Sequence, residues 1–187
     1  MNVHETILPG VLIIDPQRFK DHRGYFAETY NQRGYSKLGI DIDFVQDNHS
    51  MSCELTTLRG LHFQAPPHAQ VKLVRCGKGR FFDVAVDIRI GSPTYGRWVG
   101  VELSAANGLQ LLVPVGFAHG FVTRERDTEI IYKCSDYYAP RCEGAVRFDC
   151  PEIGIDWGFS GLDPILSEKD AAAPRLLDIK SPFTYEG

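Results

Sequence analysis

The stretch between residues 58 and 135 consists of short strand-like segments separated by tight turns, and this pattern restricts the fold more than any other feature of the chain. Within residues 80–90, apolar side chains at every second position share one face, and Asp83, Ala85, Asp87 and Arg89 share a second, polar face. Short links that contain glycine favour reversal of the chain into a β-hairpin. We therefore predict three strand pairs, namely 71–76 with 80–90 around Gly77-Lys78-Gly79, 98–103 with 109–113 around Asn107-Gly108, and 121–124 with 128–135.

The rest of the chain adds little helix. Residues 11–14 and 25–30 are predicted strands, whereas 31–38 and 167–173 are short helices that end at Gly39 and Pro174. Residues 44–51 are strand-like but polar, so their side chains either face water or line a cleft. Many short strands predict an all-β sandwich or barrel, and a jelly roll suits this length. We expect a single domain over residues 1–187, with 175–187 as a short C-terminal tail.

Composition and charge exclude several classes of function. The net charge is −4 and no run of Lys or Arg occurs, so a nucleic-acid surface is not expected. No apolar segment reaches the ~20 residues of a membrane span, and the N-terminus has no signal-peptide pattern. The five cysteines are odd in number and form no CxxC motif, which indicates reduced thiols in a cytoplasmic protein. A small anionic ligand stays compatible with these numbers, because a local pocket can be basic on an acidic protein.

Arg59, His62 and Lys72 bring cationic and titratable groups into segments that otherwise read as β-sheet. The conservative interpretation is solvated charge and one hydrogen-bonded histidine, and the alternative is a pocket that binds an anion and moves a proton. Strict alternation would direct Arg59 and His62 to opposite faces of one strand. A β-bulge at Gly60 would bring both to the same face. Lys72 is the hardest to attribute to the surface, since apolar residues flank it on both sides.

Three further residues have both a structural and a chemical interpretation. His119, between small residues, either caps backbone groups in a loop or is approached closely by a ligand. Tyr132 is either an ordinary strand aromatic or a proton donor in an apolar pocket beside cations. Asp170 either completes a pattern like a capping box with Ser167 or orients a histidine. Taken singly, none of these residues decides between the alternatives.

A metal site is the main rival explanation for histidines in a small β-barrel. Such sites usually combine a close histidine pair, a carboxylate and a distant histidine, but the chain has no His-x-His motif. His62 and His68 have two prolines between them, so they are poorly placed to share an ion. Taken by themselves, the residues leave metal-dependent catalysis open.

A longer pattern joins these residues. It runs through Phe19-x-Asp21-x-Arg23-Gly24-x-Phe26-x-Glu28, Gln46-x-Asn48-x-Ser50, Leu58-Arg59-Gly60-Leu61-His62-x-Gln64, Lys72-Leu73-Val74, Asp83-Val84-Ala85-Val86-Asp87-x-Arg89, Pro114-x-Gly116-Phe117-Ala118-His119-Gly120-Phe121, Tyr132-Lys133, Gly154-Ile155-x-Trp157 and Leu166-Ser167-x-Lys169-Asp170. In residue identity, order and spacing, this pattern resembles the dTDP-4-dehydrorhamnose 3,5-epimerase family over nearly the whole stretch from Phe19 to Asp170.

The resemblance implies a cupin-type jelly roll, a homodimer, no metal and no cofactor. It also implies the substrate dTDP-4-dehydro-6-deoxy-D-glucose, epimerised at C3 and C5 on the way to dTDP-L-rhamnose. His62 would be the base, oriented by Asp170, Tyr132 the acid on the opposite face of the sugar ring, and Lys72 the group that stabilises the enolate oxygen. The expected substrate-binding residues are Arg23, Arg59 and His119 at the diphosphate, together with Glu28, Gln46, Asn48, Lys72, Glu143 and Lys169.

These residue types suit the chemistry that the resemblance implies. A hydrogen next to a ketone is acidic only if the resulting enolate is stabilised, which an ammonium group can do. Inversion requires removal of a proton from one face and return to the other, hence two separate groups. Three alternatives stay open: a single-centre epimerase of a related dTDP-keto sugar, a metal-dependent cupin enzyme such as a dioxygenase, and a non-catalytic sugar-nucleotide binder.

Overall fold

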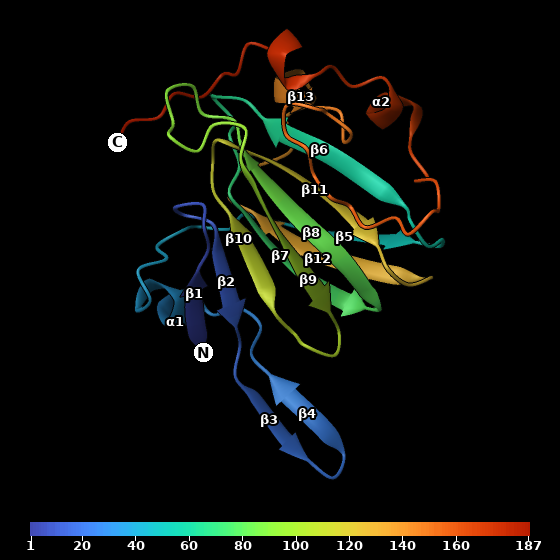
Figure 1. Cartoon of the computed structure of the whole chain (residues 1–187). Coiled ribbons are helices and arrows are strands. Elements are labelled where there is room, and N and C mark those ends of the chain that lie inside the picture. The colour runs from blue at the N-terminus through green and yellow to red at the C-terminus, as the bar shows by residue number, and fades with distance from the viewer.

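Two antiparallel sheets face each other in a computed structural model that describes residues 1–187 (Figure 1). The strands of the six-stranded sheet are β1 Asn2–Glu5, β2 Leu12–Asp15, β5 Gln46–Ser52, β7 Lys72–Lys78, β10 Gln110–Val113 and β12 Thr128–Cys134. Those of the five-stranded sheet are β6 Leu58–Gln64, β8 Arg80–Asp87, β9 Trp98–Ser104, β11 Phe117–Thr123 and β13 Glu143–Ala145. Their spatial orders are β1-β2-β10-β7-β12-β5 and β13-β6-β11-β8-β9.

From β5 to β13 the chain alternates between the two sheets, except that β8 and β9 are neighbours in one sheet, so the three predicted strand pairs are wrong. β7 and β8 lie in different sheets, as do β9 and β10, and β11 and β12. The glycine turns do reverse the chain, and Gly79 and Gly108 adopt positive φ angles of 77° and 64°. Each reversal crosses from one sheet to the other, so that β7, for example, pairs with β10 and β12 instead. This alternation is typical of a jelly roll, and the predicted all-β sandwich is confirmed.

The core between the sheets is made from alternate residues of facing strands. Val74 and Ile130 of the six-stranded sheet pack in one cluster with Phe81 of the five-stranded sheet. The polar face of β8 also lies on this interior side, where Asp83 and Asp87 are fully buried. Its polarity therefore marks buried carboxylates, which need partners inside the protein.

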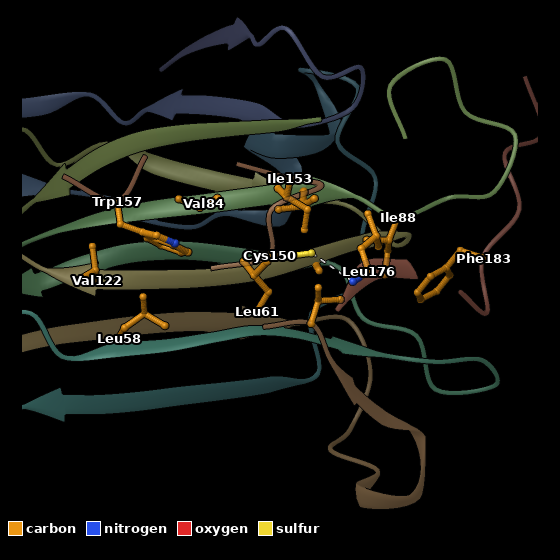
Figure 2. Packing of buried hydrophobic residues seen from close by; sticks show 13 residues of the cluster. Leu58, Leu61, Val84, Ile88, Val122, Cys150, Ile153, Trp157, Leu176 and Phe183 are labelled. Carbon is orange, nitrogen blue, oxygen red and sulfur yellow. Dashed lines mark hydrogen bonds between the residues drawn. The ribbon is translucent and has the colours of Figure 1, made fainter. Parts of the chain in front are cut away.

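A second apolar cluster covers the outer face of the five-stranded sheet (Figure 2). In this cluster Trp157 and Leu176, from the C-terminal part of the chain, pack with Val84 of β8. The residues predicted as a tail belong to the same layer, since Phe183 is only 6% exposed and the next residue forms an isolated bridge with Ile90. Part of the C-terminal segment is therefore packed against the sheet.

Helical structure is confined to short segments, as predicted. The N-cap of α1 is Asn31 and that of α2 is Ser167, and α1 covers the outer face of the six-stranded sheet through Tyr35. None of the helices has the length and apolarity to cross a membrane. Their bounds are α1 Gln32–Ser36 and α2 Glu168–Ala171, with single 3-10 turns at Pro140–Cys142 and Leu176–Asp178.

A separate hairpin, formed by β3 (Arg18–Asp21) and β4 (Gly24–Ala27), projects from the sandwich (Figure 1). It leaves Phe19, Tyr25 and Phe26 largely exposed, Phe26 to 69%. Several large apolar side chains that face water on one projecting element indicate a contact surface.

Candidate active site

Two cavities between the sheets, of about 430 and 320 Å³, share His62, Lys72 and Tyr132 in their walls. The larger cavity is also lined by Arg59, His119, Lys169 and Asp170. The smaller cavity is also lined by Gln46, Asn48, Tyr138 and Glu143. The two cavities together make one elongated site, with the three shared residues at its junction.

A β-bulge at Gly60 directs both Arg59 and His62 into the larger cavity. His62 lies opposite His119 of β11, but Arg59 lies opposite the residue only two positions further along, so the register shifts by one residue between them. A Cβ atom on Gly60 would lie 2.6 Å from the Cα atom of Gly120, which only glycine permits. The predicted bulge is confirmed, and it resolves the conflict between strict alternation and a shared face.

His62 and Asp170 form a close pair, with 2.6 Å between Nε2 and Oδ1. Asp170 lies in α2, where its backbone N–H donates to the Ser167 hydroxyl and that hydroxyl donates to the second carboxylate oxygen. Both interpretations of Asp170, as part of the helix cap and as the partner of a histidine, therefore hold. Burial raises the pKa of Asp170, but the hydrogen bond and charge of His62 outweigh it, so the net pKa is lowered. An ionised Asp170 fixes one nitrogen of His62 and leaves the other free to accept a proton.

Lys72 and Tyr132 enter the site from the opposite sheet. Lys72 begins β7 and lies opposite Cys134 of β12, two residues beyond Tyr132. Burial raises the pKa of Tyr132, so the phenol is protonated at neutral pH. Burial lowers the pKa of Lys72, while the nearby acidic groups of Cys134, Asp83 and Glu143 act on that pKa in the opposite direction without forming a hydrogen bond to the ammonium. An ammonium group without a hydrogen-bonded partner is available to an anionic oxygen.

Positive charge dominates the larger cavity. Arg59, Lys72 and Lys169 line it together with two histidines, and Asp170 is the only carboxylate in its lining. His119 is 8% exposed, and its Nε2 lies 2.7 Å from Oδ1 of a residue behind it, Asp83. A concave surface with this excess of cations attracts an anionic ligand.

Amide and carboxylate groups line the smaller cavity. The side-chain amide of Gln46 donates to Asn48, and Glu143 pairs with Lys169 at 2.5 Å. Glu143 also accepts a hydrogen bond from the hydroxyl of Tyr138 at 3.1 Å. Tyr138 was not among the predicted site residues, because a tyrosine in a polar loop looks like an ordinary surface residue in the sequence. Only the fold brings it to the cavity.

Two predicted binding residues lie outside both cavities. Arg23, in the turn of the β3–β4 hairpin, has a side chain 78% exposed and pairs with Asp21 at 2.6 Å. Glu28, just after β4, is exposed. Every other predicted site residue lines at least one of the cavities. A single chain therefore brings together the predicted site except for the two residues at the hairpin.

The histidines near the site do not gather around one point. His68 pairs with Asp136 near the surface, at 3.1 Å, whereas His62 pairs with Asp170. No three His, Cys, Asp or Glu side chains come together in an arrangement suited to a metal ion. His62 and His68 are thus in separate surroundings, as the prolines between them predicted.

The arrangement suits proton transfer on a bound anionic molecule. His62 comes from the five-stranded sheet, and Tyr132 and Lys72 come from the six-stranded sheet. A base on one wall and an acid on the other can remove a proton from a carbon and return one from the opposite side. The ammonium group between them can stabilise the charge of an enolate formed next to a carbonyl.

Comparison with known proteins agrees with this geometry. A family model described as dTDP-4-dehydrorhamnose 3,5-epimerase matches residues 5–178. The dTDP-4-dehydrorhamnose 3,5-epimerase of Salmonella typhimurium is 55% identical over 177 residues, which cover 94% of this chain and 96% of that protein.

Solved structures with bound ligands are also similar over all or nearly all of the chain. The crystal structure of dTDP-6-deoxy-D-glucose-3,5-epimerase from Legionella pneumophila, in complex with dTDP-4-keto-L-rhamnose, has a TM-score of 0.95 at 44% identity and covers 100% of this chain and 99% of that one. The dTDP-4-dehydrorhamnose 3,5-epimerase of Bacillus anthracis, with TDP and PPi bound, has a TM-score of 0.90 at 44% identity, over 93% of this chain and 98% of that one. By the family match and by identity along nearly its entire length, the chain belongs to the dTDP-4-dehydrorhamnose 3,5-epimerase family.

Proposed function

We propose that the chain epimerises dTDP-4-dehydro-6-deoxy-D-glucose at C3 and C5 and forms dTDP-4-dehydro-L-rhamnose. The observation that carries this proposal is the position of His62 and Tyr132, which come from opposite sheets and line one site with Lys72 at its junction. The relatives described above carry this activity in their names, and one of them was crystallised with dTDP-4-keto-L-rhamnose.

In the first step, the nitrogen of His62 that is not bound to Asp170 takes the proton from a carbon next to the C4 ketone. The electron pair of the broken C–H bond moves into the ring bond to C4, and the carbonyl oxygen becomes an enolate oxygen. The ammonium group of Lys72 stabilises this negative charge, and the carboxylate of Asp170 stabilises the imidazolium. A positioned base typically accelerates such a step by about 100- to 10,000-fold.

In the second step, Tyr132 donates a proton to the same carbon from the opposite face of the ring. The enolate returns to the ketone with inverted configuration, and the phenolate and the imidazolium regain their starting states by exchange with water. Because burial raises the pKa of Tyr132, the phenol still carries its proton when the enolate forms. The same two steps at the second carbon beside C4 complete the double epimerisation.

The nucleotide part of the substrate positions the sugar. Arg59 and His119 bind the diphosphate, while Gln46, Asn48, Glu143 and Lys169 contact the sugar or the nucleoside. The excess of cations in the larger cavity and the amides of the smaller one support this division. The diphosphate takes no part in the chemistry, but binding it fixes the ring between base and acid.

A homodimer completes the site. β5 is an edge strand of its sheet and carries Gln46 and Asn48. The β3–β4 hairpin exposes apolar side chains and is paired with neither sheet. The hairpin of a second copy, added along the β5 edge, covers these apolar side chains and delivers Arg23 and Glu28 to the site.

The proposal is tested by incubating the purified protein with dTDP-4-dehydro-6-deoxy-D-glucose in heavy water and following the sugar by proton NMR. We expect deuterium at both C3 and C5 and the appearance of dTDP-4-dehydro-L-rhamnose. Exchange at one carbon alone would identify a single-centre epimerase. Folded protein that catalyses no exchange, or that loses its activity with a chelator, would contradict the proposed reaction.

A further inference from the structure

Only two buried side-chain oxygen or nitrogen atoms in the molecule lack a hydrogen-bond partner, Oδ2 of Asp83 and Oγ of Ser50. Ser50 lines the larger cavity, and Asp83 is bonded through its other oxygen to His119, which lines the same cavity. Unpaired buried polar atoms are rare in folded proteins, and both of these lie at the candidate active site. Asp83 carries a formal charge and has no part in the reaction steps described above, so its role needs a separate explanation.

Asp83 lies on β8, directly behind His119 of the neighbouring strand β11. His119 is opposite Ala85 in the register of these strands, so Asp83 occupies the diagonal position on the same face. Its Oδ1 lies 2.7 Å from Nε2 of His119, and no protein group is hydrogen-bonded to Nδ1 of that ring. The imidazole therefore has a carboxylate on one side and a cation-rich cavity on the other.

Another carboxylate of the same strand shows how a buried aspartate is normally satisfied. Asp87 is as fully buried as Asp83, but it accepts hydrogen bonds from Arg89, Ser92 and Thr94. Asp83 has one partner only, and that partner is a histidine. Since an isolated buried charge is strongly unfavourable, the carboxylate of Asp83 favours a positive charge on the one ring that it contacts.

We propose that Asp83 is a positioning residue for the diphosphate of the substrate and that it acts through His119. Asp83 accepts a hydrogen bond from Nε2–H and stabilises the ring as an imidazolium, whose Nδ1–H is then available to an anion in the larger cavity. The inference rests on the proposed function, because the nucleotide diphosphate supplies that anion. The other titratable or charged groups around the cavity are Arg59, His62, Lys72, Tyr132, Lys169 and Asp170.

The first test compares two variants of the full-length chain, Asp83→Asn and Asp87→Asn, by titration of dTDP in a calorimeter near neutral pH. Asparagine keeps the size of the side chain and an acceptor oxygen but removes the charge. We expect Asp83→Asn to raise the Kd for dTDP by about tenfold or more, the size of one lost charge-assisted hydrogen bond. Asp87→Asn should lower the melting temperature and leave the Kd unchanged. An unchanged Kd in Asp83→Asn, or an equal loss in both variants, would overturn the inference.

The second test is made on the wild-type protein, so its result does not depend on whether a variant without the Asp83 carboxylate folds. The ring nitrogens of histidine are isotopically labelled in the wild-type protein, and NMR reports which of them carry protons in the dTDP complex; His119→Gln identifies the signals of His119. We expect both nitrogens of His119 to be protonated near neutral pH. A neutral ring in a normal dTDP complex would overturn the role of Asp83 alone, whereas wild-type protein that binds no dTDP would overturn it together with the proposed function.

Discussion

The cavity between the sheets and the β3–β4 hairpin differ in whether their side chains find partners within one chain. In the cavity, His62 is bonded to Asp170 and Glu143 to Lys169, so these four side chains are held in place before any ligand arrives. The hairpin instead leaves Phe26 and two further aromatic side chains in water. Burial of such side chains is strongly favourable, so the hairpin is an element that gains from a partner. This difference indicates that one chain assembles the proton-transfer groups, and it is the basis for the proposal that a second copy completes the anion contacts.

The largest effect is expected from a change inside the cavity, His62→Ala. Removal of the proposed base should lower kcat by about 100- to 10,000-fold, which is the contribution typical of a positioned base. The Kd for dTDP should change little, since His62 acts on the sugar. Turnover followed by proton NMR and dTDP binding followed by calorimetry measure the two quantities. A variant that still turns over at the wild-type rate would remove His62 from the mechanism.

A smaller effect is expected when the anion contact of the cavity itself is removed by Arg59→Ala. Loss of one charged hydrogen bond of about 1.5–3 kcal/mol corresponds to a KM roughly 10- to 150-fold higher, with kcat less affected. Steady-state kinetics separate the two parameters. The matched control is Arg97→Ala, because Arg97 lines neither of the two cavities of the site. Unchanged KM in Arg59→Ala would show that the diphosphate lies elsewhere.

Mixing two variants of low activity tests whether the hairpin of one chain serves the cavity of the other. Arg23→Ala impairs the hairpin and His62→Ala impairs the cavity, so each protein alone should have low activity. After unfolding and refolding together, random pairing makes about half of the dimers mixed, and each mixed dimer has one site with both residues intact. We expect recovery to about a quarter of wild-type activity. Lack of recovery, with mixed dimers demonstrated by mass spectrometry, would mean that Arg23 does not serve the site of the other subunit.

The smallest effect is a displaced alkaline limb in the pH profile of kcat. Burial lowers the pKa of Lys72, so with rising pH this lysine loses its charge earlier than an ordinary lysine does, while burial raises the pKa of Tyr132 and delays the loss of the phenol proton. Activity should therefore fall at a pH below the ordinary lysine value of about 10.4. Lys72→Arg, which keeps its charge throughout this range, should lack that limb in whatever activity it retains. The same limb in both proteins would assign it to another group.

Local features such as the bulge and the turns were predictable from the sequence, but the pairing of the strands was not. The bulge at Gly60 follows from a conflict between Arg59 and His62 that short-range alternation exposes. The glycine turns predicted where the chain reverses, but they carry no information about which sheet the next strand joins. That choice depends on packing between residues distant in sequence, such as Val74 with Phe81 across the core.

Charged residues show the same limit. The sequence placed Asp83 on a polar face of β8, but its one hydrogen-bond partner in the interior is His119, which is 36 residues away in the chain. The cap pattern of Ser167 and Asp170 was visible, and the approach of His62 to that cap was not derivable from spacing. Arg23 and Glu28 were expected at the site by family resemblance alone, and in the single chain neither of them lines a cavity of the site.

The most direct test of the central claim is Tyr132→Phe in heavy water with dTDP-4-dehydro-6-deoxy-D-glucose. If His62 removes the proton and Tyr132 returns one from the other face, this variant should still introduce deuterium next to the ketone, with the original configuration kept. Formation of dTDP-4-dehydro-L-rhamnose should fall by about 100- to 10,000-fold. Inversion at the wild-type rate would contradict the claim that the two groups act from opposite faces of the sugar.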